Sequence, residues 1–315
     1  MRFQHRDAQI LLKIFENDGV LARRHIKENF WPDKSMRAME VRLSKLKHHE
    51  YISWPTREHQ KTMPIPEPIC WLGWRGAQFI AGLHGVRVDD INGDSENQQR
   101  VLQKELRDNG IRWVREPRWS LLRHDLAIFD FRLAVENSAN EIQSINIENW
   151  ITESVFRSDM DVVDYKVRSQ SGEVKKLKRG VCPDAYVEIV NEELYLRGDE
   201  KSRCLLELDM ATHSNPSFGR DKARPYASYI NSPKYKSRFG SNEGIWLVVT
   251  SGQEKRLKNL IRQTKEKTGD NSGMFLFTTL NQLTIGNILT SPIWCQVDND
   301  NLIPLISTTS EQSIL

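Results

Sequence analysis

The sequence lacks the features that mark disulfide-stabilised, zinc-binding and membrane-spanning proteins. Its four cysteines are scattered and form no Cys-x-x-Cys pair, so we expect reduced thiols and neither a disulfide framework nor a zinc site. No apolar stretch approaches the ~18 residues that a membrane span needs. The first residues, MRFQHRDAQ, contain no apolar signal segment. These absences predict a cytoplasmic protein without a membrane partner.

Motifs that bind nucleotides are also missing. There is no Gly-rich phosphate loop, no nucleotide-binding motif and no metal-binding cluster of His and Cys. We therefore expect neither an ATPase, a zinc protein nor a nucleotide sensor, and we predict no small-molecule cofactor. The chain has 315 residues, of which 38% are hydrophobic and 28% charged, and this composition fits a globular protein of two domains.

The net charge of +3 is small, but the positive charge is unevenly distributed. Residues 1–70 contain 13 Lys and Arg against 9 Asp and Glu, whereas the rest of the chain contains 32 against 33. A phosphate-binding surface needs a local excess of this kind, although an ordinary solvated face has the same composition. The charge distribution alone therefore does not decide between the two.

The first 85 residues carry the order of elements of a winged helix-turn-helix domain. Apolar residues at helical spacing predict three helices, over residues 5–17, over residues 22–30 and from residue 35, and two β-prone stretches, 51–54 and 69–72, predict a wing. In such a domain the third helix enters the major groove and the wing contacts the DNA backbone or the minor groove. The expected DNA-contacting residues are Arg37, Arg42, Lys45, Lys47 and Arg57. Winged helices also bind other proteins, and that alternative stays open.

Residues 86–120 are interpreted as a connector, and residues 121–315 as a second domain of the α/β class with a mixed central sheet. The predicted helices cover residues 124–137, 217–230 and 254–269. The predicted strands cover residues 142–153, 182–190, 193–197, 203–211, 245–250 and 274–279. We expect residues 157–179 to form an exposed loop because they are rich in Lys, Arg and Gly.

Three acidic residues fall where neighbouring strands bring them together. Asp184 begins one predicted strand, and Glu207 and Asp209 lie two residues apart on the next. Side chains alternate along a strand, so Glu207 and Asp209 share a face and converge with Asp184 if the two strands are antiparallel. Oxygen ligands of this kind suit Mg²⁺ or Mn²⁺, and Asp184 and Glu207 are the candidate metal ligands. The alternative is that all three are solvent-facing residues of an amphipathic strand.

These residues resemble a known family pattern. Pro183-Asp184 followed by Glu207-Leu208-Asp209 is similar to the motif of the PD-(D/E)XK nuclease superfamily, which implies a restriction-endonuclease-like domain with a catalytic metal. The N-terminal winged helix, His124-Asp125 and the run Glu207-x-Asp209-x-x-Thr212 with Lys222 and Tyr226 resemble the replication-relaxation family of plasmid and mobile-element proteins. That resemblance covers about residues 5 to 280.

One position departs from the superfamily motif. The motif ends in a lysine, and this chain has Asp209 there. A lysine helps to activate the attacking water or stabilises charge on the phosphate. Lys222, on the following helix, is the residue that could replace it, so the predicted catalytic set is Asp184, Glu207, Asp209 and Lys222. The alternative for Lys222 is a surface lysine within a basic run.

Other residues are weaker candidates. The first core helix of the superfamily often adds an acidic residue, for which Asp130 and Glu136 are available. The narrower family resemblance singles out His124, although a histidine that opens a helix is more often a cap or a core contact. Tyr226 could bond a phosphate or pack in the core.

The sequence thus supports three hypotheses. The first is a metal-dependent DNA endonuclease or nicking protein of a plasmid or mobile element, for which a homodimer would allow both strands to be cut. The second is a DNA-binding accessory factor for replication, relaxation or transfer with a degenerate nuclease fold. The third is a transcription regulator whose C-terminal domain senses a ligand.

Overall fold

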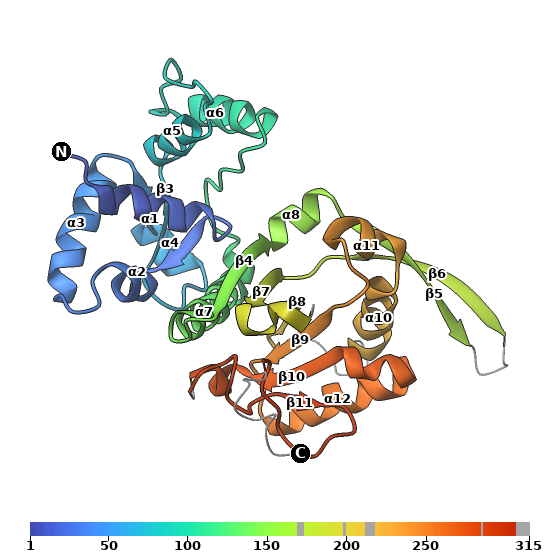
Figure 1. The fold of residues 1–315 in the computed structure, drawn as a ribbon. Coiled ribbons are helices and arrows are strands. Elements are labelled where there is room, and N and C mark those ends of the chain that lie inside the picture. Colours follow the sequence, from blue (N-terminus) through green and yellow to red (C-terminus); the bar gives the residue numbers. More distant parts are fainter. Residues whose placement is uncertain (169–172, 198–199, 212–217, 285, 307–315) are drawn as a thin grey trace. The chain divides into compact units, whose positions relative to one another are not determined.

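The chain divides into two compact units, residues 1–130 and residues 131–315. The computed structural model describes residues 1–168, 173–197, 200–211, 218–284 and 286–306 (Figure 1). The division falls within helix α7 (Leu122–Asn140). Among the described residues, no helix combines the length and the apolar character that a membrane crossing requires.

The first unit has the elements of a winged helix. Its three helices are α1 (His5–Phe15), α2 (Arg23–Phe30) and α3 (Met36–His48), and its three-stranded antiparallel sheet has the order β1 (Val20–Ala22), β3 (Ile69–Leu72), β2 (Ile52–Ser53). The first helix was predicted over residues 5–17 and ends at Phe15, and Asp18 and Gly19 shortly after it both have positive φ, 54° and 92°. Met39, Leu43 and Leu46 form the buried face of α3, whereas Met36 is 47% exposed.

Two features of the winged helix were not predicted. Strand β1 is only three residues long, and so short a segment carries no alternation that a sequence pattern can reveal. The wing contains a helix, α4 (Arg57–Thr62), between the two β-prone stretches that the sequence indicated. Thr56 caps this helix, because its hydroxyl accepts a hydrogen bond of 3.2 Å from the His59 N–H.

The predicted connector, residues 86–120, belongs to the first unit. Helices α5 (Trp74–Leu83) and α6 (Glu96–Asp108) precede the 3₁₀ helix η1 (Trp119–Leu121). Trp113 Nε1 donates a hydrogen bond of 3.1 Å to the Leu72 carbonyl, and the Trp119 ring meets the Trp71 ring edge-on with centroids 5.8 Å apart. Two tryptophans therefore fasten the end of this segment to strand β3.

The second unit is built on a six-stranded mixed sheet, which confirms the predicted α/β class (Figure 1). The strand order is β11 (Cys295–Gln296), β10 (Phe275–Thr279), β9 (Ile245–Thr250), β8 (Lys201–Asp209), β7 (Ala185–Asn191), β4 (Ile145–Thr152). Strands β4, β7 and β8 are antiparallel neighbours, and β8, β9 and β10 run parallel. The helices between the parallel strands are α10 (Arg224–Ile230), α11 (Pro233–Phe239) and α12 (Glu254–Thr268).

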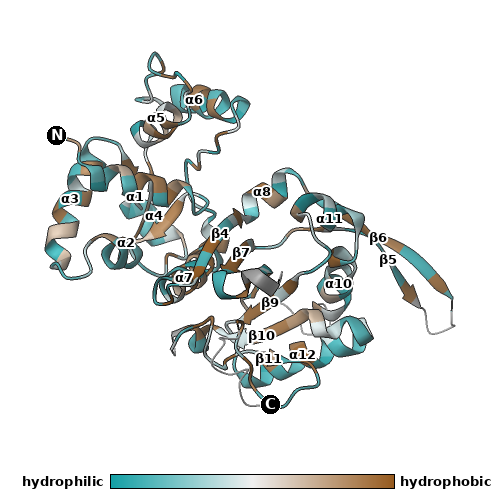
Figure 2. Ribbon diagram, viewed as in Figure 1, coloured by the Kyte–Doolittle hydropathy of each residue, from teal (hydrophilic) through white to brown (hydrophobic). Residues whose placement is uncertain are grey.

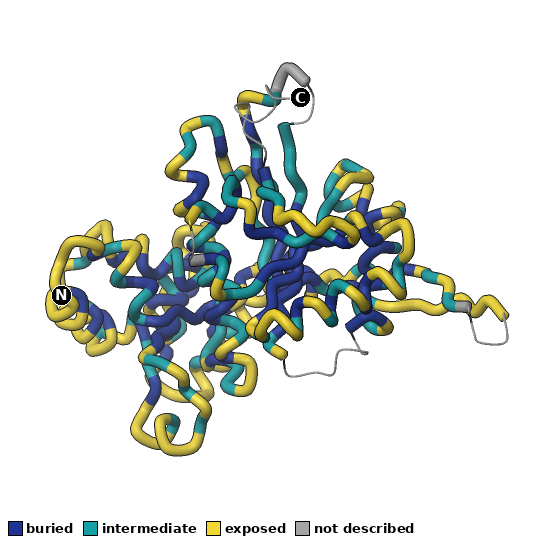
Figure 3. Tube along the Cα trace, turned by 90° about the horizontal axis from the view of Figure 1, so that it is seen from below, coloured by how far each residue is buried: buried dark blue, intermediate teal, exposed yellow. Residues whose placement is uncertain are grey.

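Burial explains why the central strands were well predicted. Strands β9 and β10 are apolar along their length (Figure 2) and lie in the interior of the unit (Figure 3). Helices α10, α11 and α12 pack their apolar side chains on one face of the sheet, against residues such as Trp246 and Phe275. Residues 204–209 of β8 are all buried, so both faces of that strand are covered.

Two predictions for the second unit were wrong. Residues 157–179 are not a loop: they contain the end of α8 (Glu153–Ser158) and most of an antiparallel hairpin of β5 (Asp161–Arg168) and β6 (Val174–Val181). Residues 193–197 are not a strand but belong to the 3₁₀ helix η2 (Glu192–Arg197). In both cases the polar composition carries little periodicity, and pairing or local turns decide the conformation.

The predicted helix over residues 217–230 contains a wide turn. Residues 219–223 form a π-helical turn, η3 (Gly219–Ala223), which continues directly into α10. Pro225 lies in the first turn of α10 and has no N–H to bond to a carbonyl of the preceding turn. The helix is therefore interrupted by a π-helical turn just before the proline, and such turns are frequent at functional sites. After α12 the chain continues through η4 (Gly269–Met274), and η5 (Leu280–Thr284) follows β10.

Candidate functional site

The three predicted carboxylates are buried rather than solvent-facing. Asp184, Glu207 and Asp209 are 7%, 2% and 8% exposed. Strands β7 and β8 are antiparallel, with Ala185 opposite Leu206. The Asp184 N–H donates to the Leu206 carbonyl at 2.9 Å, and Asp184 Oδ2 accepts from the Leu208 N–H at 2.6 Å. These bonds fix the Asp184 carboxylate against strand β8, beside Glu207.

Glu207 is held between a lysine and a tyrosine. Its Oε1 pairs with Lys222 Nζ, and its Oε2 accepts a hydrogen bond of 2.6 Å from Tyr226 Oη. Burial raises the pKa of Glu207 above its usual value and the nearby Asp184 carboxylate adds to this, although the Lys222 ammonium group opposes both. Asp184, Glu207 and Lys222 thus interact electrostatically, so the site contains two carboxyl groups and one ammonium group.

Lys222 reaches the strands from the π-helical turn η3. Burial by itself lowers the pKa of Lys222, but the Glu207 and Asp184 carboxylates more than offset this, so the pKa is raised and the side chain is an ammonium group at neutral pH. The Lys222 side chain is still 42% exposed, whereas Glu207 is almost fully buried. The charge of Lys222 therefore lies between the buried carboxylates and solvent.

Tyr226 holds the Glu207 carboxylate from the core side of the site. Its ring stacks on Trp246 with centroids 3.8 Å apart, and its hydroxyl is committed to Glu207. Because its ring is buried and its hydroxyl bonds to Glu207, Tyr226 acts as a positioning residue for the Glu207 carboxylate.

Asp209 belongs to a different interaction. Its carboxylate accepts hydrogen bonds from Arg256 Nη2 at 2.7 Å, from Arg256 Nε at 2.8 Å and from Thr250 Oγ1 at 2.7 Å. Burial by itself raises the pKa of Asp209, but the bonds from Arg256 and Thr250 hold it below its usual value. The residue that replaces the motif lysine is therefore an ion-pair partner of helix α12, and its oxygens do not contact Lys222.

Glu153 is a further acidic residue that the sequence analysis did not identify. Strand β4 pairs with β7 so that Thr152 lies opposite Ala185, and Glu153 therefore comes next to Asp184. The carboxylates of Glu153 and Asp184 each have an oxygen within 4.8 Å of the other, and Glu153 is 5% exposed. Glu153 also bonds to Arg157, with Nε at 2.8 Å from Oε1. The available signal was its place at the end of the strand that pairs with that of Asp184.

The other candidates have separate partners. Asp130 bonds to Arg24, with Nη2 at 2.7 Å, and to His25, with Nε2 at 2.9 Å. Glu136 bonds to Arg132 at 2.7 Å. His124 lies in the first turn of α7, within residues 1–130, with Nδ1 at 3.5 Å from Asp125 Oδ1. Thr212 lies outside the described residues.

The donor atoms of the second unit fit a hard divalent cation. Asp184, Glu207 and Glu153 offer only carboxylate oxygens, which Mg²⁺ and Mn²⁺ prefer. Glu207 already accepts two donors, but a carboxylate has about four acceptor positions, so both functions are compatible. The adjacent Cys182 offers no thiolate at neutral pH, because burial and then Glu153 raise the pKa of its thiol to about 11.

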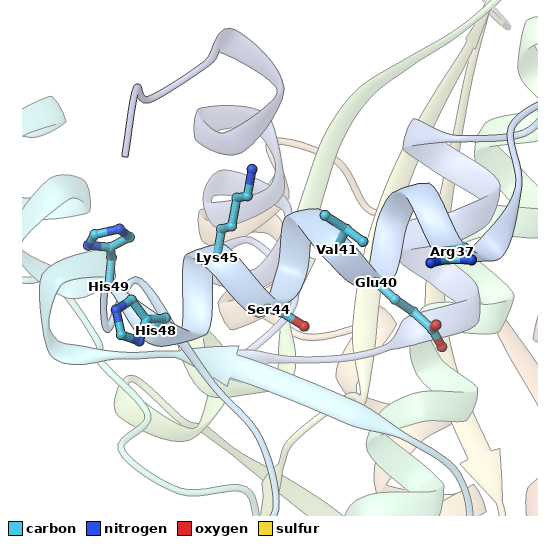
Figure 4. A pocket seen from close by; sticks show the side chains of 7 residues that line it. All are labelled: Arg37, Glu40, Val41, Ser44, Lys45, His48 and His49. Carbon is cyan, nitrogen blue, oxygen red and sulfur yellow. The ribbon is translucent and has the colours of Figure 1, made fainter.

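A second candidate surface lies on the outer face of helix α3, in the first unit. A shallow pocket of about 540 Å³ is lined by residues of one face of this helix and the turn after it (Figure 4): Arg37, Glu40, Val41, Ser44, Lys45, His48 and His49. Within the described residues neither Arg37 nor Lys45 has an ion-pair partner, and both are exposed. The exposed face of α3 therefore carries Arg37 and Lys45, two of the residues predicted from the sequence to contact DNA.

The other predicted DNA contacts have different surroundings. Arg42 pairs with the fully buried Asp7, with Nε at 2.7 Å from Oδ1, so its guanidinium group ties α3 to α1. The Lys47 ammonium group lies 5.5 Å from the centre of the Trp54 ring. Arg57 is exposed at the first residue of α4. Of the five predicted residues, Arg37, Lys45, Lys47 and Arg57 are exposed, whereas Arg42 is committed to Asp7.

Comparison with known proteins gives one assignment. No curated protein and no solved structure matches the chain. The sequence pattern of the replication-relaxation family matches residues 12–245, a span that includes the winged helix from the last turn of α1 onward, Asp184, Glu207 and Lys222. The chain therefore belongs to the replication-relaxation family.

Proposed function

We propose that this protein binds DNA through helix α3 and hydrolyses phosphodiester bonds at a metal site formed by Asp184 and Glu207, with Lys222 as the catalytic ammonium group. The observation that carries the proposal is the Lys222–Glu207 contact beside Asp184. A charged lysine occurs at the carboxylates although its usual place on the strand is taken by Asp209. Family membership supports a role in plasmid or mobile-element replication or relaxation.

The residues of the chain would divide the work of phosphodiester hydrolysis. A bound Mg²⁺ or Mn²⁺, held by Asp184, Glu207 and Glu153, would polarise the scissile phosphate and activate a water. The partly exposed Lys222 ammonium group would face the phosphate and stabilise the negative charge that develops there. Tyr226 and the Leu208 N–H would keep Glu207 and Asp184 in fixed orientations. Fixed orientations of these charged groups have a larger electrostatic effect in a buried site, because water screens the charges less there.

The proposal is tested by incubating supercoiled plasmid with the purified protein in Mg²⁺, in Mn²⁺ and in EDTA. We expect nicked or linear product with either metal and none with EDTA. Linear duplex and single-stranded DNA are tested in parallel, because the site does not indicate which form is cut. If no form is cut with either metal, the protein is not a nuclease.

One observation favours a second candidate function. Asp209 accepts hydrogen bonds from Arg256 and Thr250, and Glu207 forms an ion pair with Lys222. A nuclease fold that has lost its activity and serves only to bind DNA would also have its acidic residues paired within the protein. The protein would then be an accessory factor in replication, relaxation or transfer. In that case wild-type protein binds DNA but leaves it intact under all metal conditions.

Replacing Arg37 and Lys45 together with alanine is expected to weaken DNA binding and to flatten its salt dependence. Each lost phosphate contact lowers the slope of log K against log salt by about 0.9, so the double variant should lose about 2 in slope. Fluorescence anisotropy with a labelled duplex at several salt concentrations measures both quantities.

The matched control for this double variant is Lys104→Ala with Arg107→Ala. These two residues are exposed on α6 in the same unit, and their removal changes the net charge equally. An equal loss of slope in both variants would mean that α3 makes no particular contact, and an unchanged slope in the α3 variant would favour a protein partner for this helix.

A further inference from the structure

Among the described residues, the hairpin of β5 and β6 is attached to the rest of the second unit at the end formed by Asp161 and Val181. At this base Val163 and Val181 are buried in the main core of the second unit, 2% and 1% exposed. Asp161 Oδ2 accepts a hydrogen bond of 2.7 Å from Tyr229 Oη and another of 2.7 Å from Arg238 Nε. The base of the ribbon therefore has a fixed orientation on helices α10 and α11.

Beyond this base, strand β6 and one face of strand β5 are exposed to solvent in the described part of the ribbon. Residues 174–179 of β6 are all exposed, including Val174 at 51% and Leu177 at 42%, and Figure 3 shows the two strands extending away from the buried sheet. An isolated two-stranded ribbon is at best marginally stable in water. The outer half of the hairpin therefore contributes little to the free energy of folding, so its residues can be used to bind a partner.

The charges on one face of the ribbon point to the chemistry of that partner. Cross-strand neighbours share a face, and the register places Lys166 opposite Lys176 and Asp164 opposite Lys178. Lys178 Nζ is 3.9 Å from Asp164, whereas Lys166 and Lys176 have no acidic partner within the described residues. Like charges directly opposite each other destabilise a strand pair unless an anion lies against them.

We infer that the face of the β5–β6 ribbon with Lys166, Lys176 and Lys178 is a second DNA-binding element, which holds the phosphate backbone of duplex DNA beside the carboxylate site. The inference rests on the proposed function and adds a contact that belongs to the second unit. A two-stranded ribbon is one of the two elements that fit the major groove. Strand β6 ends at Val181, three residues before Asp184, so a short stretch of chain joins the base of the ribbon to the carboxylate site.

Lysines on exposed strands also prevent edge-to-edge aggregation, and this explanation needs no DNA. The two explanations differ in measurable ways. A protective lysine affects solubility, whereas a phosphate-binding lysine affects the affinity for DNA and its dependence on salt.

The test replaces Lys166, Lys176 and Lys178 with glutamine in the full-length protein. Three lost phosphate contacts should lower the salt slope of duplex binding by about 2 to 3 and the affinity at 0.15 M salt by up to about a hundredfold. The hydroxyl-radical footprint on a labelled duplex should lose protection at one side. The single variant Lys176→Gln should lose about 0.9 in slope, which keeps the test available if the triple variant does not fold.

The matched control replaces Lys255, Lys258 and Lys265, which are exposed on α12, with glutamine for the same change in net charge. An equal loss in the control would overturn the inference, as would normal duplex binding with increased aggregation of the ribbon variant. A loss confined to single-stranded DNA or to anionic vesicles would also overturn it. If the ribbon variant binds normally and the Arg37/Lys45 variant does not, the inference fails while the proposed function stands.

Discussion

Asp184→Asn is expected to lower metal-dependent DNA cleavage by about 10³-fold or more while leaving DNA binding unchanged. A catalytic metal contributes several kcal/mol to the transition state, and each 1.36 kcal/mol corresponds to about a factor of ten in rate. Asparagine keeps an oxygen that can accept the Leu208 N–H, which Asp184 accepts at 2.6 Å, so the strand contact survives while the charge is lost. Single-turnover cleavage and anisotropy with the same labelled DNA measure the two effects separately.

The control for this substitution is Asp270→Asn, which removes an exposed carboxylate of η4 in the same unit. Cleavage by this variant should equal that of the wild-type protein. If Asp184→Asn cleaves as well as wild type, the observed activity does not use this site.

Lys222→Gln separates catalysis from structure at the same site. If Lys222 stabilises the phosphate, cleavage should fall by about 10²- to 10³-fold, as for the loss of one preorganised donor, while duplex affinity stays the same. If Lys222 only neutralises Glu207, the melting temperature changes and the cleavage rate of the folded protein does not.

Arg256→Ala is expected to destabilise the second unit by about 3 to 5 kcal/mol. Asp209 is 8% exposed and receives two guanidinium bonds from Arg256, so removal of the arginine leaves a buried carboxylate without its charge partner. For a unit of this size the loss corresponds to a fall in melting temperature of about 10 °C. Differential scanning calorimetry of the full chain measures the transition of this unit.

Arg262→Ala is the matched control on the same helix. Arg262 and Glu266 form an exposed pair, with side chains 60% and 44% accessible, and such pairs contribute about 0.3 to 0.5 kcal/mol. The double variant Asp209→Ala with Arg256→Ala should recover part of the stability, because no buried charge is left unpaired. Equal losses for the two arginines would mean that Asp209 tolerates burial alone.

The same pair predicts a pH dependence. Because the bonds from Arg256 and Thr250 keep the pKa of Asp209 below its usual value in the folded state, their stabilisation is complete above the ordinary carboxyl pKa of about 3.9. It is lost as the pH falls through the lowered pKa of the folded state. In Arg256→Ala, burial without the guanidinium group raises the pKa of Asp209. The difference in stability between wild type and Arg256→Ala should therefore be constant while Asp209 is ionised in both proteins, and should shrink as the pH falls from the raised pKa of the variant to the lowered pKa of wild type.

The sequence predicted those parts of the fold whose burial leaves a pattern. The apolar strand β9 is observed over residues 245–250 and β10 over residues 275–279, because a strand covered on both faces is a continuous apolar run. Strand β6 was missed because residues 174–179 are all exposed, so no alternation of apolar and polar residues was needed there. Strand β5 does alternate, since Val163, Tyr165 and Val167 are less exposed than Asp164 and Lys166, but the signal is short. A basic, Gly-containing segment of this kind has the same composition whether it is a loop or an exposed ribbon.

The sequence identified several residues of the candidate site but not the contacts that these residues make. Asp184 and Glu207 were identified from their places on adjacent strands, and the antiparallel register brings them together. The pairing of Asp209 with Arg256 joins residues 47 positions apart on a strand and a helix, and no local pattern encodes it. Glu153 was missed because its position depends on the register of β4, which the sequence does not specify.

The π-helical turn before α10 determines the direction in which Lys222 points. An α-helix turns by about 100° per residue, so one residue more or less between Gly219 and Ala223 would carry the ammonium group to another side of the helix. The lysine is thus placed by helical phase and not by its distance from the strand motif along the chain. Relatives that carry a lysine at another position of this helix can keep the same charge at the carboxylates, provided that the length of the turn changes with it.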